Sequence, residues 1–567
     1  MSVQSEYERW LSSPRVLEED KEILRHLSKE EIDDAFFKDI EFGTAGMRGI
    51  LGPGTNRMNV FTIRKATVAF ARYLHEKFLD AKIRGVVIAH DNRHFSREFT
   101  LESAEVLNAM GIRTYIFDSL RPTPELSFAV RELGACGGIV ITASHNPKEY
   151  NGYKVYDENG CQLVPSKIQR LLDILASLPA ELDVEIPSGQ DKECTITLPP
   201  SIDDQYVEQV LSIQLNPNLD KSHYRIVFTP QHGTSYVNAM RIFKEAGYQI
   251  IPVEEQCSPD PDFSHTLSPN PEERKAYVRA LEVAKEHQAD LILMTDPDAD
   301  RVGVAYRNAQ GEYDYFTGNE SGGLLMDYIF QQRKEKGTLA KNSIMFNTIV
   351  TSAFGAAIAK YYHVKVESLL TGFKFIGDRV HEYEVSKKAT FAFGYEESYG
   401  CLIAPFVRDK DGLQALLMLA EMGVYYANQG LTLDQAIENL YRKLGFYYKD
   451  IQYSIFFKGA AGSRDMNDLM KRLRMLSVNS IAGYKIIRVE DYLKSEAYEK
   501  GKIKPILLPK SDVVKLILEG GSSIAVRPSG TEPKCKFYVG AVGKNKEEVE
   551  NLPKKLYQDF AKIMKIE

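Results

Sequence analysis

The hydrophobic and polar positions of this chain follow one repeated order: a short apolar run, then a polar turn, then a helical stretch. Apolar runs of this length, bounded by turn residues and alternating with helices, predict parallel β-sheets with helices on both faces. Because ligands of such sheets gather at the carboxyl ends of the strands, we expect the chemistry in the polar turns. The runs and the turns that follow them are RGVVIA-HDNRHFS, ACGGIVIT-ASHNP, YRIVFT-PQHGTS, ADLILMT-DPDADR and NSIMF-NTIVTS.

Changes in this pattern divide the chain, whose 567 residues are too many for one hydrophobic core. Residues 180–200 are rich in Pro, Asp and Glu, and residues 311–323 form a second break. From residue 445 on, the segment GFYYKDIQYSIFF alternates in character, which indicates a strand-rich end. We expect α/β domains over residues 1–200, 201–320 and 321–445, and an α+β domain over residues 446–567.

Composition argues against several classes of protein. The formal net charge of −7, from 71 basic and 78 acidic residues, is atypical of proteins that wrap nucleic acid. The six cysteines are scattered without a CxxC pair, so they predict neither disulfides nor a zinc site. We find no signal-peptide pattern and no run of about 18 apolar residues, which a membrane span requires. We therefore expect a cytoplasmic protein with neither nucleic acid nor membrane as a partner, while the charge leaves anionic small ligands open.

Ser144 lies in the segment T-A-S-H-N-P, directly after an apolar run that contains two glycines. A serine held on such a rigid turn could act as a nucleophile, although capping a helix or a turn is the commoner role of serine there. The segment does not match the G-x-S-x-G elbow of serine hydrolases, so it does not predict acyl transfer.

Three carboxylates alternate in the segment D-P-D-A-D-R, those of Asp296, Asp298 and Asp300. Carboxylates this close repel one another unless a cation neutralises them, and three oxygen ligands on a tight loop suit Mg²⁺. The loop is not an EF-hand, because Arg301 and Arg307 stand where that loop requires glycine and a bidentate glutamate. The alternative interpretation is a solvated acidic turn.

Two further turns combine glycine with basic side chains. The segment R-P-S-G-T-E-P-K places Arg527 and Lys534 around two hydroxyls and a glycine, a combination that suits a phosphate dianion. The segment G-T-A-G-M-R-G carries Arg48. Neither is a Walker A loop, and each could be a tight turn with a surface arginine.

Weaker signals lie between residues 371 and 412. In G-Y-E-E-S-Y-G, the side chains of Glu396 and Ser398 could hydrogen-bond to sugar hydroxyls. The segments T-G-F-K and R-D-K-D-G place Lys374 and Lys410 in loops. Each of these signals is weak alone.

Together and in this order, these segments resemble those of the α-D-phosphohexomutase superfamily, which includes phosphoglucomutase and phosphomannomutase. The resemblance covers nearly the whole chain and is nearest to the branch of bacterial α-phosphoglucomutases and the eukaryotic phosphoglucomutase-2 type. It implies three mixed α/β/α sandwich domains and a smaller C-terminal α+β domain, related to the TATA-box-binding-protein-like fold, around a central cleft. Some bacterial members carry a histidine just after the sugar loop, whereas here Cys401 follows Gly400, which puts that acid/base assignment in doubt.

The resemblance implies an enzyme that interconverts glucose 1-phosphate and glucose 6-phosphate through a phosphoserine and glucose 1,6-bisphosphate, with Mg²⁺ as cofactor. The implied metal ligands are Ser144, which also carries the phosphoryl group, and Asp296, Asp298 and Asp300. The other implied catalytic residues are Arg48 and Arg301, which stabilise the phosphoryl group, and Lys154 and Lys410, which act as acid or base. The implied substrate-binding residues are His145, Thr371, Gly372, Lys374, Glu396, Ser398, Arg527, Ser529, Gly530, Thr531 and Lys534.

Other activities on the same residues stay open. Mannose, glucosamine or pentose phosphates could replace glucose phosphate, because a few loop contacts distinguish these sugars. A magnesium-dependent sugar phosphatase would share Ser144 and the aspartates, but it would not need the sugar loop and the phosphate-binding loop. A catalytically silent binding protein is expected to have lost part of a motif, whereas Ser144 and all three aspartates are intact. The oligomeric state is not predicted.

Overall fold

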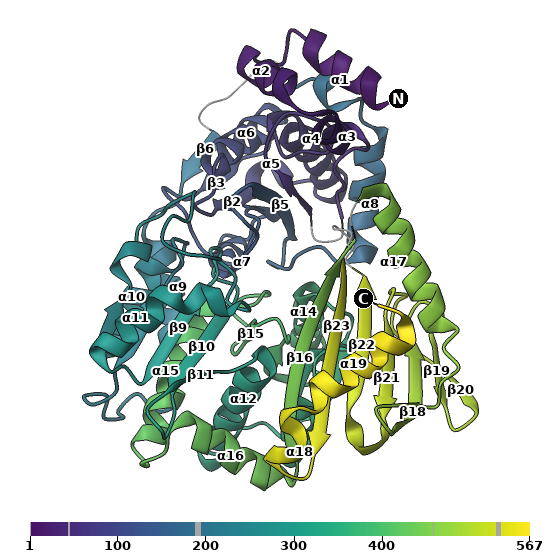
Figure 1. The fold of residues 1–567 in the computed structure, drawn as a ribbon. Coiled ribbons are helices and arrows are strands. Elements are labelled where there is room, and N and C mark those ends of the chain that lie inside the picture. Colours follow the sequence, from purple (N-terminus) through teal and green to yellow (C-terminus); the bar gives the residue numbers. More distant parts are fainter. Residues whose placement is uncertain (1, 44–45, 188–193, 458, 529–533, 567) are drawn as a thin grey trace.

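The computed structural model describes residues 2–43, 46–187, 194–457, 459–528 and 534–566. Within these ranges the strands form four main sheets, which follow one another along the chain. Figure 1 shows the first sheet and its helices at the top, the second sheet at the lower left and the C-terminal sheet at the lower right.

The first sheet is mixed and has the strand order β1-β5-β4-β2-β3-β6. Its strands are β1 (Met47–Ile50), β2 (Val86–His90), β3 (Thr114–Ile116), β4 (Gly137–Ile141), β5 (Tyr150–Asp157) and β6 (Thr195–Thr197). The helices of this part are α1 (Val3–Ser12), α2 (Glu18–His26), α3 (Lys29–Phe36), α4 (Val60–Lys77), α5 (Ala81–Arg84), α6 (Ser96–Ala109), α7 (Thr123–Glu132) and α8 (Pro165–Ser177). Both β2 and β4 are buried along their whole length, which explains their nearly unbroken apolar sequences.

The second and third sheets repeat this architecture with the orders β11-β10-β9-β7-β8 and β13-β12-β14-β15. The second sheet consists of β7 (Ile226–Thr229), β8 (Ile250–Pro252), β9 (Leu291–Thr295), β10 (Val302–Arg307) and β11 (Tyr313–Tyr315), and the third of β12 (Ser343–Thr348), β13 (Lys365–Leu369), β14 (Thr390–Tyr395) and β15 (Cys401–Leu402). Their helices are α9 (Ser201–Leu211), α10 (Tyr236–Glu245), α11 (Val278–His287), α12 (Gly318–Glu335), α13 (Ala353–Tyr361), α14 (Phe373–Ser386), α15 (Gly412–Ala427) and α16 (Leu433–Leu444).

The predicted strand–turn–helix order is wrong at two of the predicted turns. After the Ser144 turn the chain returns as β5, antiparallel to β4, and after the Asp296 turn it returns as β10, antiparallel to β9. The sugar loop likewise connects β14 to the antiparallel β15. The returning segments NGYKVYD and VGVAYR are rich in residues that favour strands. For this reason they form antiparallel strands where the pattern predicted a helix. Three predicted functional loops therefore occupy equivalent hairpins in three successive sheets.

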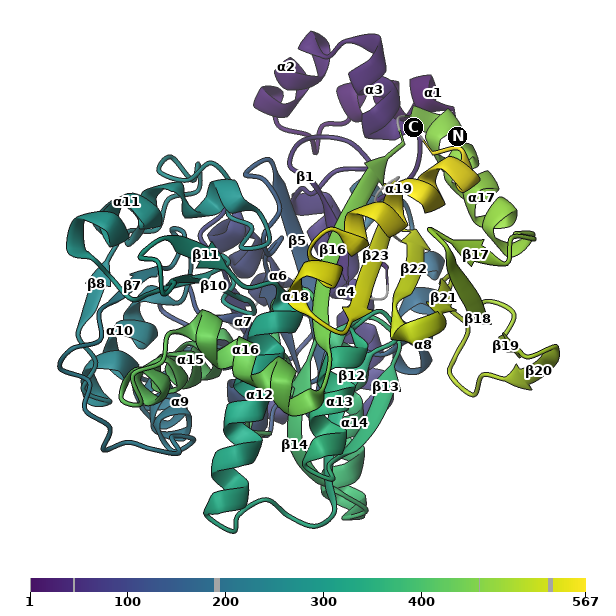
Figure 2. The same cartoon turned by 60° about the horizontal axis from the view of Figure 1, so that its bottom comes forward.

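The C-terminal sheet is antiparallel and has the order β16-β23-β22-β21-β18-β19-β20, with β17 paired to β18. Its strands are β16 (Tyr447–Phe456), β17 (Ser480–Ile481), β18 (Tyr484–Asp491), β19 (Glu496–Glu499), β20 (Lys502–Pro505), β21 (Val514–Leu518), β22 (Ser523–Pro528) and β23 (Lys534–Gly543). Its helices are α17 (Gly459–Arg474), α18 (Lys546–Glu550) and α19 (Leu552–Met564). Figure 2 shows the long β16 and β23 side by side and the β19–β20 hairpin at the far edge. Three α/β parts and one α+β part confirm the predicted fold class.

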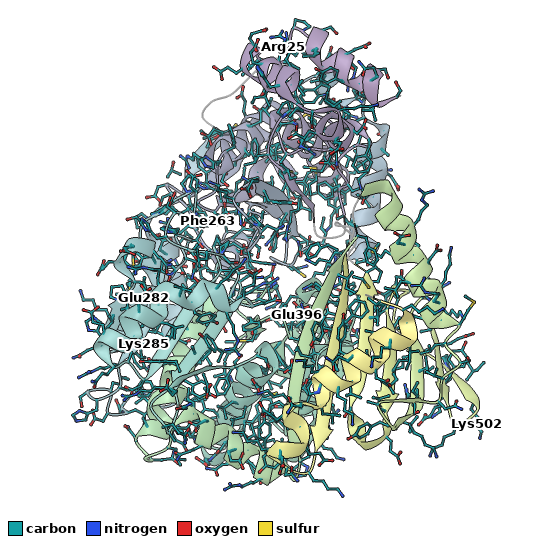
Figure 3. The ribbon with its side chains drawn as sticks, in the orientation of Figure 1. Arg25, Phe263, Glu282, Lys285, Glu396 and Lys502 are labelled. Carbon is teal, nitrogen blue, oxygen red and sulfur yellow. The ribbon has the colours of Figure 1, made fainter. Side chains whose placement is uncertain are left out.

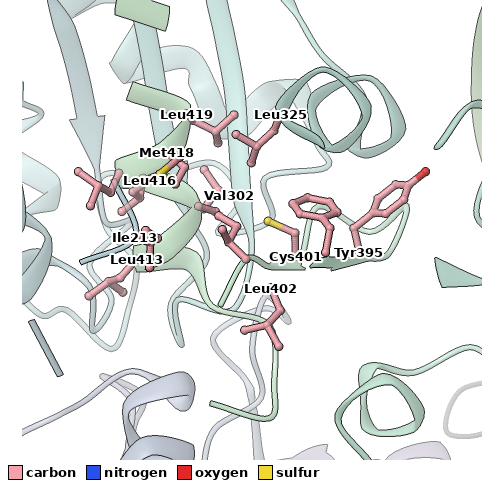
Figure 4. Close-up of a cluster of buried hydrophobic side chains, with 14 of the residues drawn as sticks. Ile213, Val302, Leu325, Tyr395, Cys401, Leu402, Leu413, Leu416, Met418 and Leu419 are labelled. Carbon is pink, nitrogen blue, oxygen red and sulfur yellow. The ribbon is translucent and has the colours of Figure 1, made fainter. Parts of the chain in front are cut away.

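One apolar cluster joins the second and third sheets. Figure 4 shows it around Cys401, with Val302 from β10, Leu325 from α12 and Leu413 from α15. The Cys401 side chain packs in this cluster, 8% exposed. The C-terminal sheet packs a separate cluster around Phe537, so its core is largely its own. The domain limits stay a prediction, and α12 crosses the predicted limit at residue 320.

All six cysteines carry free thiols, as their spacing predicts. Among the described residues, no helix combines the length and the apolar character that a bilayer span requires.

Candidate active site

Ser144 lies in the hairpin loop after β4 and is buried, with 2% of its surface exposed. Its backbone has a left-handed φ of 52°, and its N–H donates to Thr142 Oγ1 at 2.8 Å, which stabilises the turn. Its Oγ donates to Asp296 Oδ2 at 2.8 Å and lies 3.2 Å from His145 Nδ1. The structure therefore brings the predicted serine and the predicted metal loop together from two different sheets.

Arg93 holds this loop in place and was not predicted as a site residue. Its side chain is fully buried against Asp91, with 3.1 Å between Nε and Oδ2. Its guanidinium donates to the carbonyls of Ser144 (2.6 Å), Asn146, Pro147 (2.7 Å) and Tyr150 (3.0 Å). Arg93 belongs to the turn HDNRHFS, where the strand pattern directs attention. However, contacts to backbone carbonyls leave no motif in a sequence.

The three aspartates belong to the hairpin loop after β9, and each is at most 3% exposed. One carboxylate oxygen of each lies within 4.8 Å of the others, so together they could hold a metal ion. Asp296 Oδ1 accepts the backbone N–H groups of Asp300 at 3.1 Å and Arg301 at 3.0 Å, and these bonds fix the loop.

The burial of this cluster supports a cation at the same place. Asp298 Oδ1 and Asp300 Oδ1 are buried and make no hydrogen bond to any part of the chain that the structure describes. Buried oxygens without donors are costly unless another group neutralises them. Burial, and then the charges of Asp298 and Asp300, raise the pKa of Asp296 well above its usual value. The residues present thus fit a divalent metal ion bound through oxygen.

Two lysines pair with these carboxylates. Lys154 on β5 donates to Asp298 Oδ2 at 2.7 Å, and Lys410, before α15, lies 3.0 Å from Asp300 Oδ2. Burial alone would lower the pKa of Lys410, but the Asp300 and Asp409 carboxylates raise it. Lys410 therefore keeps its proton at neutral pH.

Gly400 gives Lys410 its space. A Cβ at position 400 would overlap the Lys410 side chain and lie 3.1 Å from the Asp300 carbonyl oxygen. We expect Gly400→Ala to displace Lys410 and, through the predicted role of that lysine as acid or base, to lower kcat by about 10- to 100-fold. Steady-state kinetics of Gly400→Ala, Lys410→Met and the double variant check this. If the double variant is much slower than Lys410→Met alone, the methyl group does not act through Lys410.

Two arginines lie beside the metal loop and the Ser144 loop. The Arg301 guanidinium lies 3.6 Å and 3.9 Å from two of the aspartates, and Arg48 Nη1 donates to Asn146 Oδ1 at 3.0 Å. Burial, and then the charges of Arg301 and Arg48, lower the pKa of His145 well below its usual value, so its imidazole is uncharged at neutral pH. A dianion at the Ser144 loop would be attracted by both guanidinium groups.

The predicted sugar loop lies near the middle of the molecule, where Figure 3 labels Glu396. Glu396 Oε1 accepts the backbone N–H of Gly372 at 2.8 Å, which joins two of the predicted substrate-binding loops. Thr371 Oγ1 is buried and makes no hydrogen bond within the described ranges, and Ser398 is half-buried. These groups can accept and donate hydrogen bonds to hydroxyls of a ligand.

Three predicted phosphate-binding residues, Ser529, Gly530 and Thr531, lie outside the described residues. Arg527 on β22 and Lys534 on β23 flank that segment. Burial, and then the charge of Arg527, lower the pKa of Lys374 to about 8. The structure therefore brings the basic end of β22 close to the loop before α14.

A cavity of about 620 Å³ adjoins these groups and is lined by residues from all four parts, the first contributing His145. Pockets of this size hold small ligands. His145, Glu272, Tyr399, Lys534 and Lys536 are among its lining residues. Lys536, which was not predicted, shares one face of β23 with Lys534 because side chains alternate along a strand.

Family models of four domains match this chain in order. They are described as phosphoglucomutase/phosphomannomutase α/β/α domains I, II and III, at residues 39–181, 204–311 and 317–444, and the C-terminal domain, at residues 484–558. The chain belongs to the phosphoglucomutase/phosphomannomutase family. The predicted superfamily is thereby confirmed, as is an enzyme of the phosphohexomutase class.

Individual relatives agree with this family. The phosphoglucomutase of Staphylococcus aureus (strain USA300) is 38% identical over 535 residues, 93% of this chain and 95% of that protein. That of Staphylococcus epidermidis is 38% identical over 92% of this chain and 94% of its own length.

The crystal structure of a putative phosphomannomutase from Thermus thermophilus has a similar fold, with a TM-score of 0.69 at 22% identity, covering 93% of this chain and 99% of its own. The open form of pp63/parafusin from Paramecium has a TM-score of 0.65 at 18% identity, covering 93% and 96%.

Proposed function

We propose that this phosphohexomutase interconverts glucose 1-phosphate and glucose 6-phosphate in the cytoplasm, with Ser144 carrying the phosphoryl group between them. The contact that supports this most directly is the 2.8 Å hydrogen bond from Ser144 Oγ to Asp296 Oδ2. It places the serine at the edge of the three-carboxylate cluster. The phosphoglucomutase relatives at 38% identity favour glucose over mannose or a pentose.

Asp296, Asp298 and Asp300 would hold Mg²⁺ together with an oxygen of the phosphorylated Ser144. The ion would draw negative charge from the phosphoserine and make the serine oxygen a better leaving group. Three oxygen ligands of one loop and two buried oxygens without hydrogen bonds suit this hard cation.

The reaction proceeds in two phosphoryl transfers, one from Ser144 and one back to it. In the first, the free hydroxyl of glucose 1-phosphate attacks the phosphoserine, the P–O bond to Ser144 breaks, and the proton of that hydroxyl passes to Ser144 Oγ by way of a nearby base. The product is glucose 1,6-bisphosphate, which also serves as activator. After the bisphosphate turns over in the cleft, Ser144 Oγ attacks the phosphorus of the C1 phosphate, and the P–O bond to the sugar breaks. The serine proton passes to a nearby base, the departing sugar oxygen takes up a proton, and glucose 6-phosphate leaves. Lys410 is suited to protonate the departing sugar oxygen, because its raised pKa keeps it charged.

Other residues would bind and align the substrate. Arg48 and Arg301 would meet the equatorial oxygens of the phosphoryl group in flight. Lys154 would act as an acid or base and would balance the charge of Asp298. The remaining proposed contacts are with the sugar hydroxyls, from Glu396, Ser398, Thr371 and His145, and with the non-reacting phosphate, from Arg527, Ser529, Gly530, Thr531, Lys534 and Lys374. Gly372 would support substrate binding by holding Glu396 through its backbone N–H.

Phosphorus NMR tests this proposal. The purified protein would be mixed with Mg²⁺, a trace of glucose 1,6-bisphosphate and, separately, the 1-phosphates of glucose, mannose and ribose. We expect a 6-phosphate signal to grow fastest from glucose 1-phosphate. Faster growth from another sugar would replace glucose as the substrate. Release of inorganic phosphate would identify a phosphatase, and no change in any mixture would contradict the proposal.

We expect kcat/KM to depend on pH through the protonation of Lys374. Its ammonium group holds substrate phosphate only while protonated, and its pKa of about 8 means that the proton is lost as pH rises through that value. Because kcat/KM reports the free enzyme, we expect it to fall above about pH 8. In Lys374→Arg, whose guanidinium stays charged, this fall should disappear. Profiles of kcat/KM between pH 6 and pH 10, roughly two units either side of that pKa, check it. Identical profiles for both proteins would exclude this role.

A further inference from the structure

Glu272 connects the predicted phosphoryl-stabilising arginine to the C-terminal sheet. One carboxylate oxygen, Oε1, accepts a hydrogen bond from Arg301 Nη1. The other, Oε2, lies 3.5 Å from Gln452 Nε2 on β16. The two side chains of the ion pair are mostly buried, Arg301 at 13% and Glu272 at 16% exposed. Glu272 therefore joins the metal-loop arginine to a strand more than one hundred residues away in sequence.

Glu272 shares its cavity with the face of the C-terminal sheet that carries Lys534 and Lys536. Gln452 pairs with Tyr538, and Ser454 pairs with Lys536, in the β16–β23 ladder. All four of these side chains line the same cavity as Glu272. Burial alone would raise the pKa of Glu272, but the charges of Lys536, Arg301 and Lys534 lower it, so the carboxylate is ionised at neutral pH.

The carboxylates of Asp296 and Asp300 compete with Glu272 for the Arg301 guanidinium. The Nε atom of Arg301 lies 3.6 Å from Asp300 Oδ1 and 3.9 Å from Asp296 Oδ2. This Nε makes no hydrogen bond to a described residue. A guanidinium readily binds carboxylates through two parallel hydrogen bonds. Without Glu272, Arg301 would be drawn onto the aspartates that a metal ion needs. With Glu272 in place, Nη1 donates to the Glu272 carboxylate, and Nε stays 3.6 Å from Asp300 Oδ1 without bonding to it.

We propose that Glu272 is a positioning residue, which holds the Arg301 guanidinium off the aspartates and links its position to that of the C-terminal sheet. The inference rests on the proposed mutase function for its kinetic consequences. It assigns no contact with substrate to Glu272 itself. The residue acts through Arg301, and through Gln452 it makes that arginine sensitive to the placement of β16.

A double-mutant cycle tests the link to Arg301. We expect Glu272→Gln to lower kcat by about 10- to 100-fold and to change KM by less than about threefold, because alignment rather than substrate binding is lost. The combined Glu272→Gln/Arg301→Lys variant should be no slower than Arg301→Lys alone. If the two losses multiply instead, Glu272 does not act through Arg301 and the proposal fails.

Glu273→Gln is the matched control. It removes the same charge from the next residue, whose side chain is 43% exposed and pairs with Lys275 at 2.9 Å. We expect it to change kcat by less than about twofold, as exposed ion pairs contribute little. A loss equal to that of Glu272→Gln would mean that only local charge matters, which overturns the proposal. Should Glu272→Gln unfold, Glu272→Asp keeps the charge, retracts it by one methylene and is expected to lower kcat in the same direction. An unchanged kcat in that variant also overturns the proposal.

A binding measurement separates this inference from the proposed function. Electron paramagnetic resonance measures Mn²⁺ affinity without any turnover. Because the freed Arg301 competes for Asp296 and Asp300, we expect Glu272→Gln to bind Mn²⁺ at least about tenfold more weakly than the wild type, as happens when supporting contacts around metal ligands are lost. An unchanged affinity overturns the inference even if the wild type proves to be a mutase. A failed sugar assay with weakened Mn²⁺ binding refutes only the proposed function.

Discussion

Replacing Ser144 with alanine is expected to lower kcat by about 10⁴-fold or more, because the variant has no oxygen to carry the phosphoryl group. Ser144 is 2% exposed, and its Oγ lies 2.8 Å from Asp296 Oδ2. A neighbouring hydroxyl or a water molecule would have to enter this buried position to replace it. Phosphorus NMR of glucose 1-phosphate with the bisphosphate activator measures the loss.

A second readout shows the phosphoserine itself. Incubation with glucose 1,6-bisphosphate should add the mass of one phosphoryl group to the wild type and none to Ser144→Ala. Ser119→Ala is a suitable control, since Ser119 is exposed and its hydroxyl forms hydrogen bonds with nearby Asp118 and Arg121. Turnover in Ser144→Ala near the wild-type rate would exclude this serine as the carrier. Phosphorylation of that variant would locate the carrier elsewhere.

The parts of the site that sequence predicts are those whose chemistry lies in one short segment. Asp296, Asp298 and Asp300 alternate on a single turn, so their mutual repulsion is visible in the sequence, and the structure gathers their carboxylates within 4.8 Å. The turns were located correctly because buried strands such as β2 and β4 read as apolar runs. The resemblance to a known superfamily then linked segments that are hundreds of residues apart.

What sequence missed depends on contacts between distant segments. Arg93 bonds to backbone carbonyls, which every residue possesses, so no side-chain pattern marks the loop that it holds. Glu272 and Gln452 meet across two sheets, and no local signal in either segment announces the other. The hairpins after β4 and β9 were missed because an apolar strand followed by a polar turn looks the same whether the chain returns as a helix or as an antiparallel strand.

Removing the charge of Asp298 is expected to reduce kcat by about 10³-fold, because a bound metal ion supplies several kcal/mol of transition-state stabilisation. Burial alone would raise the pKa of Asp298, but Lys154, 2.7 Å away, lowers it, so this carboxylate is ionised and available to a cation at neutral pH. Asp298→Asn keeps the shape of the side chain and removes that charge. Treating the wild type with a chelator should cause a comparable loss, which added Mg²⁺ should reverse.

Thermal unfolding separates a lost metal site from general damage. A ligand at about 100 times its Kd stabilises the folded state by about 2.7 kcal/mol, so Mg²⁺ should raise the unfolding temperature of the wild type. The rise should vanish in Asp298→Asn and persist in Asp314→Asn, whose carboxylate is exposed and accepts a hydrogen bond from Asn308. An equal rise in all three proteins would place the metal elsewhere. If neither the chelator nor Asp298→Asn slows the reaction, neither a bound metal ion nor the Asp298 carboxylate, with its ion pair to Lys154, takes part in catalysis.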